Sequence, residues 1–386
     1  MRPLAPSPAR ERAGERAPLT AADPILYLHE EPAGRALVER LRGRRPLFVC
    51  VVAHTDICEL PGISAAGAAP ELRRFTPAAD VEVLHHGRPR CIPDVPINPL
   101  GPPSPVLITA AAVRLAGFPY RVVSAGLRVR PDVPFALLGS AHGLDIRGGQ
   151  AVPAAGELFE GGRRLGRELA AEADYLVIGE SVPGGTTTAL ALMLALGLDA
   201  NGKVSSSMDA NPHALKAELV ATALAAAWPD GRPSDLDPLA AAAAIGDPMQ
   251  PAAAGLALGA LEVGPVVLAG GTQMAAVLAL MGAIERRAGR DLPDQHLAVA
   301  TTRWVATDPS ADLAGLARQI GAVPFLAAAL NFSASRHAGL RRYEEFLVKE
   351  GVGAGGAALA AILAAGVSHA DLLSAVEALY DDLVAG

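Results

Sequence analysis

The sequence predicts an α/β fold: a doubly wound, mostly parallel sheet of about six strands with helices on both faces, plus a small helical subdomain formed by the chain termini. Short apolar runs rich in β-branched residues recur along the chain and have the length of buried parallel strands. Segments with helical spacing lie between these runs, and strands that alternate with helices form βαβ units with right-handed crossovers. In addition, 51% of the 386 residues are apolar and 19% are charged, so the chain can bury a large core.

The individual elements can be placed in chain order. The expected strands are 47–53, 121–124, 175–179, 266–269, 297–300 and 325–330. The expected helices are 32–42, 105–116, 157–173, 187–196, 212–227, 273–287, 312–320 and 369–384. Residues 59–105 are rich in Pro and Gly and predict a long functional loop region.

These elements suggest a division of the chain into four parts. We expect a mobile tail at 1–20, an N-terminal helical segment of the small subdomain at 21–44, and an α/β core at 45–345. A catalytic glycine loop and C-terminal helices of the same subdomain are expected at 346–386.

Charge and composition exclude several classes of protein. The chain has 33 basic and 40 acidic residues, a net charge of −7, which argues against a nucleic-acid-binding protein. Three cysteines without a CxxC motif indicate a reducing, cytoplasmic location. The uncharged stretch 263–284 is long enough to cross a bilayer, but Pro265 and Gly270–Gly271 interrupt it, so we expect a strand, a turn and a helix instead of a membrane span.

The most informative motif is the turn 179–188, which joins an expected strand to an expected helix. It nearly matches a P-loop but has Gly185 where Lys is required, so a monophosphate ligand fits better than a triphosphate. Glycines let the backbone approach an anion, the helix start offers free N–H groups, and hydroxyls add donors. The expected cradle consists of Gly184, Gly185, Thr186, Thr187 and Thr188. An ordinary threonine-capped glycine turn is the alternative, although Glu180 at its mouth has no evident structural task.

Further candidate ligand-binding residues follow other expected strands or lie in polar stretches. They are Gly270, Gly271, Thr272, Ser205 and Asp247. Open α/β sheets bind ligands beyond the carboxyl ends of their strands, so we expect these residues near the cradle. Lys216 lies on an expected helix, where a surface lysine is the simpler interpretation.

A second glycine cluster, 349–356, contains the spacing GxGxxG. A dinucleotide site is disfavoured because few residues follow and no second strand with an acidic ribose-binding residue is apparent. Glu350 is the informative residue, since it precedes a flexible loop; a solvated surface glutamate is the alternative. We expect no cofactor and no metal, because the segment His54–Asp56 lacks a third ligand. GxSxG and HExxH do not occur, so serine hydrolases and zincins have no support.

Five motifs in the same order resemble the nicotinate-nucleotide:dimethylbenzimidazole phosphoribosyltransferase family. The resemblance runs from about residue 47 to residue 356 and is closest to a divergent branch described as nicotinate-mononucleotide-dependent phosphoribosyltransferase. The motifs are 61–67, 179–188, 246–251, 269–274 and 349–355. The better-known bacterial branch has Asn at the position of Gly185, and its benzimidazole-pocket segment does not match 63–86.

The resemblance implies a reaction and roles for single residues. It implies transfer of the phosphoribosyl group of nicotinate mononucleotide to a benzimidazole-type base with inversion at C1′, which gives α-ribazole 5′-phosphate and nicotinate for the cobalamin lower ligand. Glu350 would be the catalytic base, Glu180 the second catalytic carboxylate and Lys216 a substrate-binding lysine. Gly351 and Gly353 would belong to the substrate-binding loop, and the protein would be a homodimer. The acceptor stays open between benzimidazoles, other azoles and purines.

Two other classes of function stay open. A glycosidic hydrolase of a nucleoside monophosphate would use Glu350 to activate water, and its nicotinate release would not depend on an azole. A non-catalytic nucleotide-binding protein would keep its function when Glu350 is replaced by Gln.

Overall fold

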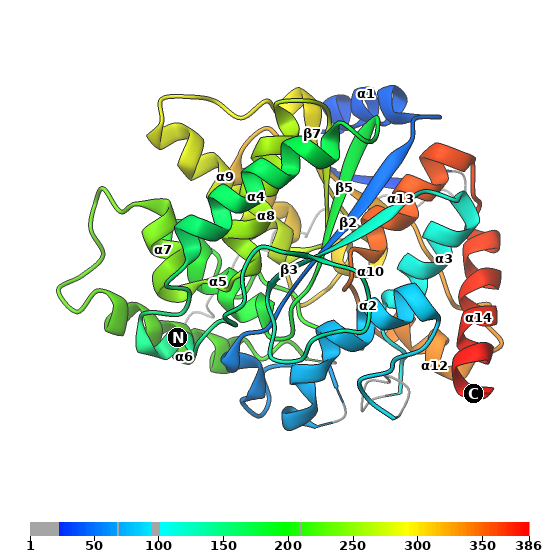
Figure 1. Ribbon diagram of the computed structural model, residues 1–386, viewed down its shortest axis with the longest axis horizontal. Helices are drawn as coiled ribbons and strands as arrows, with labels where there is room; N and C mark the ends of the chain where they lie inside the picture. Colours follow the sequence, from blue (N-terminus) through cyan, green and yellow to red (C-terminus); the bar gives the residue numbers. More distant parts are fainter. Residues whose placement is uncertain (1–22, 68, 94–100, 209, 386) are drawn as a thin grey trace, which may run out of the picture.

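The computed structural model describes residues 23–67, 69–93, 101–208 and 210–385, and the expected tail at 1–20 lies outside them (Figure 1). An eight-stranded sheet runs through the centre in the order β1-β8-β7-β6-β5-β2-β3-β4. Every pairing is parallel except that of β1 with β8. The strands are β1 Ile25–His29, β2 Pro46–Ala53, β3 Tyr120–Gly126, β4 Ala136–Leu137, β5 Tyr175–Ser181, β6 Val266–Ala269, β7 Leu297–Thr302 and β8 Phe325–Ala328.

The sheet has eight strands where about six were expected, and the two strands that were missed, β1 and β4, lie at its edges. β1 is only half-buried along most of its length, and β4 has two residues, one of them exposed. Neither strand therefore contains the continuous apolar run by which buried strands are recognised. The α/β class and the mostly parallel sheet are confirmed.

Helices cover both faces of the sheet. Alternate residues of β2 enter opposite cores: Leu47 and Val49 pack in one, Phe48 and Cys50 in the other. Figure 1 shows α4 to α9 on one side of the strands and α2, α3, α13 and α14 on the other. The helices are α1 Glu31–Leu41, α2 Thr76–His86, α3 Val106–Ala116, α4 Ala155–Ala170, α5 Gly185–Ala195, α6 His213–Ala227, α7 Pro238–Ile245, α8 Met249–Leu261, α9 Thr272–Arg287, α10 Arg303–Ala306, α11 Leu313–Ile320, α12 Ala338–Arg341, α13 Ala354–Ala365 and α14 His369–Ala385.

The expected long loop at 59–105 is in part a helix. Residues 76–86 form α2, and most of its residues are buried, so it lacks the one-sided apolar stripe that marks a surface helix. The C-terminal part of the chain lies against the sheet and its helices: α13 contacts β5 to β8, and α14 packs on α3. Among the described helices, none combines the length and apolar character needed to cross a bilayer.

Candidate functional site

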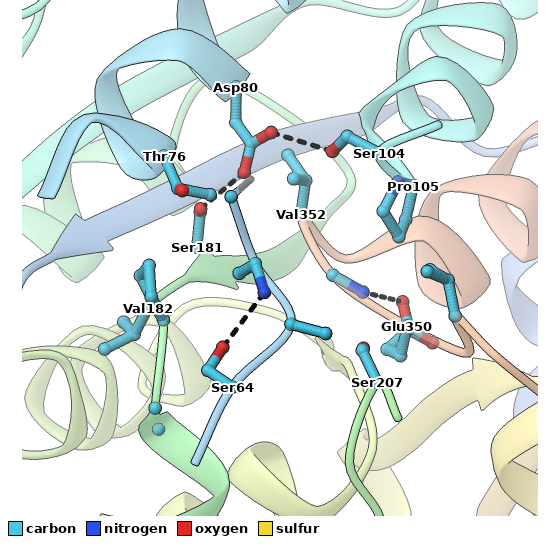
Figure 2. A pocket seen from close by; sticks show the side chains of 18 of the residues that line it. Ser64, Thr76, Asp80, Ser104, Pro105, Ser181, Val182, Ser207, Glu350 and Val352 are labelled. Carbon is cyan, nitrogen blue, oxygen red and sulfur yellow. Dashed lines mark hydrogen bonds between the residues drawn. The ribbon is translucent and has the colours of Figure 1, made fainter. Parts of the chain in front are cut away.

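A pocket of about 310 Å³ opens at the carboxyl ends of β5 and β6 (Figure 2). Six segments far apart in the chain line it: the end of β5 with its following turn, the turn after β6, residues 205–207, Val305 in α10, residues 348–352, and described residues between 63 and 105 around α2. The location is the one at which open parallel sheets bind ligands, because strand ends and helix starts meet there.

The pocket brings together nine of the fifteen residues expected at the site. Glu180, Gly184, Gly185, Thr186, Ser205, Gly271, Thr272, Glu350 and Gly351 line it. The remaining six do not line it: Thr187, Thr188, Lys216, Asp247, Gly270 and Gly353. Some of these support the lining from behind, since Thr188 donates a hydrogen bond to Asp247, which caps the start of α8 through the N–H groups of Met249 and Gln250.

Two helix starts form one end of the pocket. α5 begins at Gly185 and α9 begins at Thr272, so the positive ends of two helix dipoles meet here. Gly184 has a φ of 77°, a conformation that favours glycine, and it turns the chain into α5. This geometry suits a bound phosphate.

Lys216 supports this end of the pocket from behind. Its side chain is fully buried, contrary to the surface position that the sequence alone favoured, and its Nζ donates to Thr186 Oγ1 at 2.8 Å. Burial and the neighbouring Lys349 lower the pKa of Lys216 to about 7. An anion bound at Thr186 would favour its charged form.

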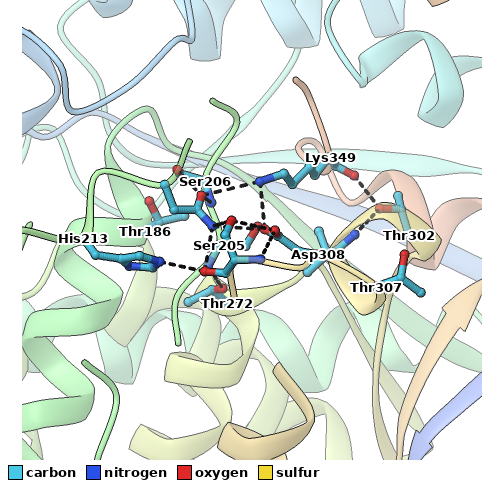
Figure 3. Close-up of polar contacts among 12 residues, drawn as sticks. Thr186, Ser205, Ser206, His213, Thr272, Thr302, Thr307, Asp308 and Lys349 are labelled. Carbon is cyan, nitrogen blue, oxygen red and sulfur yellow. Dashed lines mark hydrogen bonds and ion pairs between the residues drawn. The ribbon is translucent and has the colours of Figure 1, made fainter. Parts of the chain in front are cut away.

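A second buried lysine, Lys349, also lines the pocket (Figure 3). Lys349 Nζ is 2.7 Å from Asp308 Oδ2, which also accepts a hydrogen bond from Ser205 Oγ at 2.7 Å. Although burial opposes it, these two donors lower the pKa of Asp308 to about 2. Asp308 thus fixes both Lys349 and Ser205, which line the pocket.

Glu350 is held as a hydrogen-bond acceptor at the start of α13. Its Oε2 accepts from Thr301 Oγ1 at 2.8 Å and from the N–H of Thr302 at 2.9 Å. Its Oε1 faces the N–H groups of Gly351 and Gly355 at 3.3 and 3.2 Å. Burial still raises the pKa of Glu350, which brings this carboxylate closer to the range of an effective general base.

Glu180 has a different environment from Glu350. Its side chain is buried, and Oε2 accepts a hydrogen bond from the N–H of Val182 at 3.0 Å. Burial and the carboxyl groups of Glu350, Asp247 and Asp80 raise the pKa of Glu180 well above its usual range. Two carboxyl groups whose surroundings favour different protonation states are typical of acid–base sites.

The second glycine cluster has a structural explanation. Gly353 packs against β5, because a Cβ placed on it would lie 2.9 Å from the Cα of Gly179. Val352 has a φ of 54°, rare for a β-branched residue, and its N–H donates to the backbone oxygen of Glu180 at 2.9 Å. The glycines therefore bring Glu350 close to Glu180.

Sequence reasoning missed several residues that line the pocket or hold its lining in place. Lys349 belongs to a recognised motif, but no role was predicted for its amino group. Nothing near Asp308 in the sequence indicates a functional residue, because only the fold places it beside Lys349. Asp80 and Ser104 lie in the region expected to be a loop. Among the described residues, no group of three or more His, Cys, Asp or Glu is placed to hold a metal ion.

Comparison with known proteins gives a family and a fold. A family model described as phosphoribosyltransferase matches residues 114–290. The chain is 45% identical over 329 residues to a UPF0284 protein of Methanothermobacter thermautotrophicus, covering 84% of this chain and 90% of the relative. It is 49% identical over 358 residues to a UPF0284 protein of Gloeobacter violaceus, covering 92% and 93%.

Two solved structures share the fold. CobT from Thermus thermophilus superposes with a TM-score of 0.56 at 22% identity, covering 91% of this chain and 90% of that chain. A structure described as nicotinate-nucleotide-dimethylbenzimidazole phosphoribosyltransferase from the same organism gives a TM-score of 0.54 at 20% identity, covering 91% and 89%.

Proposed function

Because the chain belongs to the UPF0284 proteins, a divergent branch of the nicotinate-nucleotide:dimethylbenzimidazole phosphoribosyltransferase family, we propose that it transfers the phosphoribosyl group of nicotinate mononucleotide to the ring nitrogen of a benzimidazole-type base. The products are nicotinate and an α-ribazole 5′-phosphate. Homodimer formation, a cytoplasmic location and a role in assembling the cobalamin lower ligand are parts of the same proposal.

One observation carries the proposal: two helix starts and two carboxyl groups share one pocket. The starts of α5 and α9, with Thr186 and its partner Lys216, suit the 5′-phosphate of the donor. Glu180 and Glu350 line the same pocket, where the sugar of a bound ribose phosphate would lie.

The reaction follows from this arrangement. The bond from C1′ to the pyridinium nitrogen breaks, and its electron pair neutralises the departing nicotinate ring, so no strong acid is needed on that side. A bond forms from C1′ to the acceptor nitrogen on the opposite face, which inverts C1′. The acceptor azole then loses its other N–H proton to Glu350. The neutral form of Glu180 is favoured in the empty pocket, whereas the positive pyridinium ring of a bound donor would favour its charged form, and that form would stabilise the positive charge that develops at C1′.

The test is a single substitution with a matched control. We expect Glu350→Gln to lower turnover by at least about 100-fold, the usual scale for a general base, while the affinity for nicotinate mononucleotide stays unchanged. Glu345→Gln, at an exposed glutamate close by in the sequence, should keep normal turnover. Mass spectrometry of the products with a panel of azoles, and nicotinate release with and without azole, are the measurements.

Three outcomes separate the classes of function. Azole-dependent formation of a ribosyl azole phosphate supports transfer. Nicotinate release at a rate independent of azole contradicts it and favours the hydrolase. Near-normal turnover of Glu350→Gln contradicts the role of this carboxylate.

A further inference from the structure

The pocket extends beyond the carboxyl pair into a part with apolar walls. Figure 2 shows Val182, Val352 and Pro105 around this part, on the side of the pocket where α2 packs. Phe75, Ala79 and Ile92 also line the pocket. A flat aromatic ring is the kind of ligand that such walls bury favourably.

A buried carboxyl group stands out in this apolar part. Asp80, on α2, is 3% exposed and lines the pocket. It accepts hydrogen bonds from Ser181 Oγ at 2.7 Å and from Ser104 Oγ at 2.8 Å. Among the ion pairs of the described residues, none involves Asp80, so no cation compensates its burial.

The three polar groups at this point all present the same chemistry to a ligand. Ser181 and Ser104 use their hydroxyl protons on Asp80, so their remaining capacity toward the pocket is as acceptors. Burial raises the pKa of Asp80 to about 6, which leaves it ionised near neutral pH and able only to accept. An apolar ring edge placed here would take water away from the carboxylate without replacing its hydrogen bonds.

We propose that Asp80 determines acceptor specificity by accepting a hydrogen bond from the acceptor ring, so that the preferred acceptor is a fused-ring azole carrying a hydroxyl or amino donor on the edge away from the reacting nitrogen. The inference rests on the proposed phosphoribosyl transfer and names the substrate class of the same site.

The experiment compares three acceptors that differ at that edge. With nicotinate mononucleotide as donor, kcat/KM is measured for 5-hydroxybenzimidazole, 5-aminobenzimidazole and 5,6-dimethylbenzimidazole. We expect the hydroxyl and amino compounds to be preferred by about 10- to 100-fold, the range for a hydrogen bond to a charged group. In Asp80→Asn, which keeps the shape of the side chain, the preference should fall to within about 3-fold. Asp371→Asn, at an exposed aspartate at the start of α14, is the matched control and should keep the wild-type preference.

The outcomes separate this inference from the proposed function. A wild-type enzyme that prefers the dimethyl compound, or a preference that survives in Asp80→Asn, overturns the inference. A wild-type preference for the dimethyl compound overturns the inference even where the variant does not fold. Calorimetric binding of the three azoles gives a readout without turnover: if no azole supports nicotinate release, an Asp80-dependent preference in binding sustains the inference while the proposed reaction fails, and binding without preference overturns it.

Discussion

At the scale of a residue, the buried amino group of Lys216 lowers the stability of the ligand-free protein. In the unfolded chain its amino group has an ordinary pKa of 10.5, whereas burial lowers the pKa of Lys216 to about 7 in the folded protein. Between pH 7 and 10.5 the unfolded chain holds a proton that the folded chain has lost, so stability rises with pH across this window. The cost of burying the amino group is therefore fully present at and below pH 7.

The first prediction is that Lys216→Met stabilises the ligand-free protein and weakens donor binding. At about pH 6 we expect a gain of about 1–4 kcal/mol in the free energy of unfolding, the range for replacing buried charge by apolar groups, and a smaller gain at about pH 9. Donor affinity should fall about 10-fold through loss of a charge-assisted contact behind Thr186. Urea unfolding at both pH values and calorimetry with nicotinate mononucleotide measure this. Lys203→Met, at a lysine held by Asp199, is the control, and destabilisation by Lys216→Met at the lower pH would contradict the account.

The side chain of Gln273 fills the space into which a side chain at position 185 would extend. A Cβ placed on Gly185 would lie 1.6 Å from Oε1 of Gln273, a buried atom with no hydrogen-bond partner in the described structure. Both residues line the pocket. The Gln273 amide thus stands where a side chain at position 185 would begin, which gives a physical reason for glycine where the better-known branch has Asn.

The second prediction is that substitutions at these two positions are coupled. Gly185→Asn alone should lower kcat/KM by at least about 10-fold, because Gln273 must move. Adding Gln273→Gly should restore at least about 3-fold of that loss, since residues in contact couple by about 0.5–3 kcal/mol. A double-mutant cycle on kcat/KM measures the coupling, and strictly additive effects would rule it out.

The residues that were recognised from sequence share a local signal. Glu180 and Glu350 adjoin glycine-rich turns, so their place at a strand end or helix start is visible in the chain. Tertiary packing alone brings Asp80 to the pocket and Asp308 to the pocket residue Lys349, and nothing next to either aspartate in the sequence indicates a ligand. Lys216 was recognised only through family resemblance, because its helix gives no sign that this lysine is buried.

At the scale of elements, the segment 349–353 is held in position by its neighbours. Val352 donates its N–H to the Glu180 backbone, and its backbone oxygen accepts from Thr109 Oγ1 at 2.9 Å. The left-handed conformation of Val352 is unfavourable by itself, so these contacts with β5 and α3 maintain it. They fix the distance from Glu350 to the rest of the site.

The third prediction concerns Thr109→Val, which keeps the shape of the side chain and removes its hydroxyl. A buried backbone oxygen is left without its partner, so we expect a loss of about 1–3 kcal/mol in stability. Turnover should fall about 10-fold through misplacement of Glu350, while donor affinity changes little. As a control, Thr222→Val removes a hydrogen bond from a hydroxyl to the backbone oxygen of Glu218 on the exposed side of α6. It should leave stability and turnover unchanged. Equal losses in donor affinity and turnover would argue against a positioning role.

The elements predicted correctly are those with a clear period or a continuous apolar run. β6 coincides with its expected run, and α9 differs from expectation by one residue at its start. No bounds were predicted for α8 and α13, because both are rich in Ala and Gly and buried on nearly all sides, which removes the period on which helix recognition depends. The close packing of α4 on α8 shows the reason for such composition: a Cβ on Gly166 would lie 2.0 Å from a backbone oxygen of α8.

At the scale of the whole molecule, the fold joins distant parts of the chain at one edge of the sheet. The segment that carries Glu350 continues into α13, which packs across β5 to β8, the strands that also carry Glu180 and the turn after β6. The sequence suggested a separate small subdomain for the chain ends. The packing of α13 leads us to expect instead that this region and the sheet unfold together.

The fourth prediction uses the two tryptophans of the chain, because each reports on a different face of the sheet. Trp228 packs against the core that contains α4 to α9, and Trp304 is buried in the core that contains α13 and α14. Trp304→Phe leaves the first reporter and Trp228→Phe leaves the second. In each variant, the urea midpoints from fluorescence, far-UV circular dichroism and donor binding should coincide, since one cooperative unit has one transition. A transition at lower urea in Trp228→Phe that precedes the loss of helix signal would show that the face carrying α13 opens separately, and the site would then depend on a weakly held part of the chain.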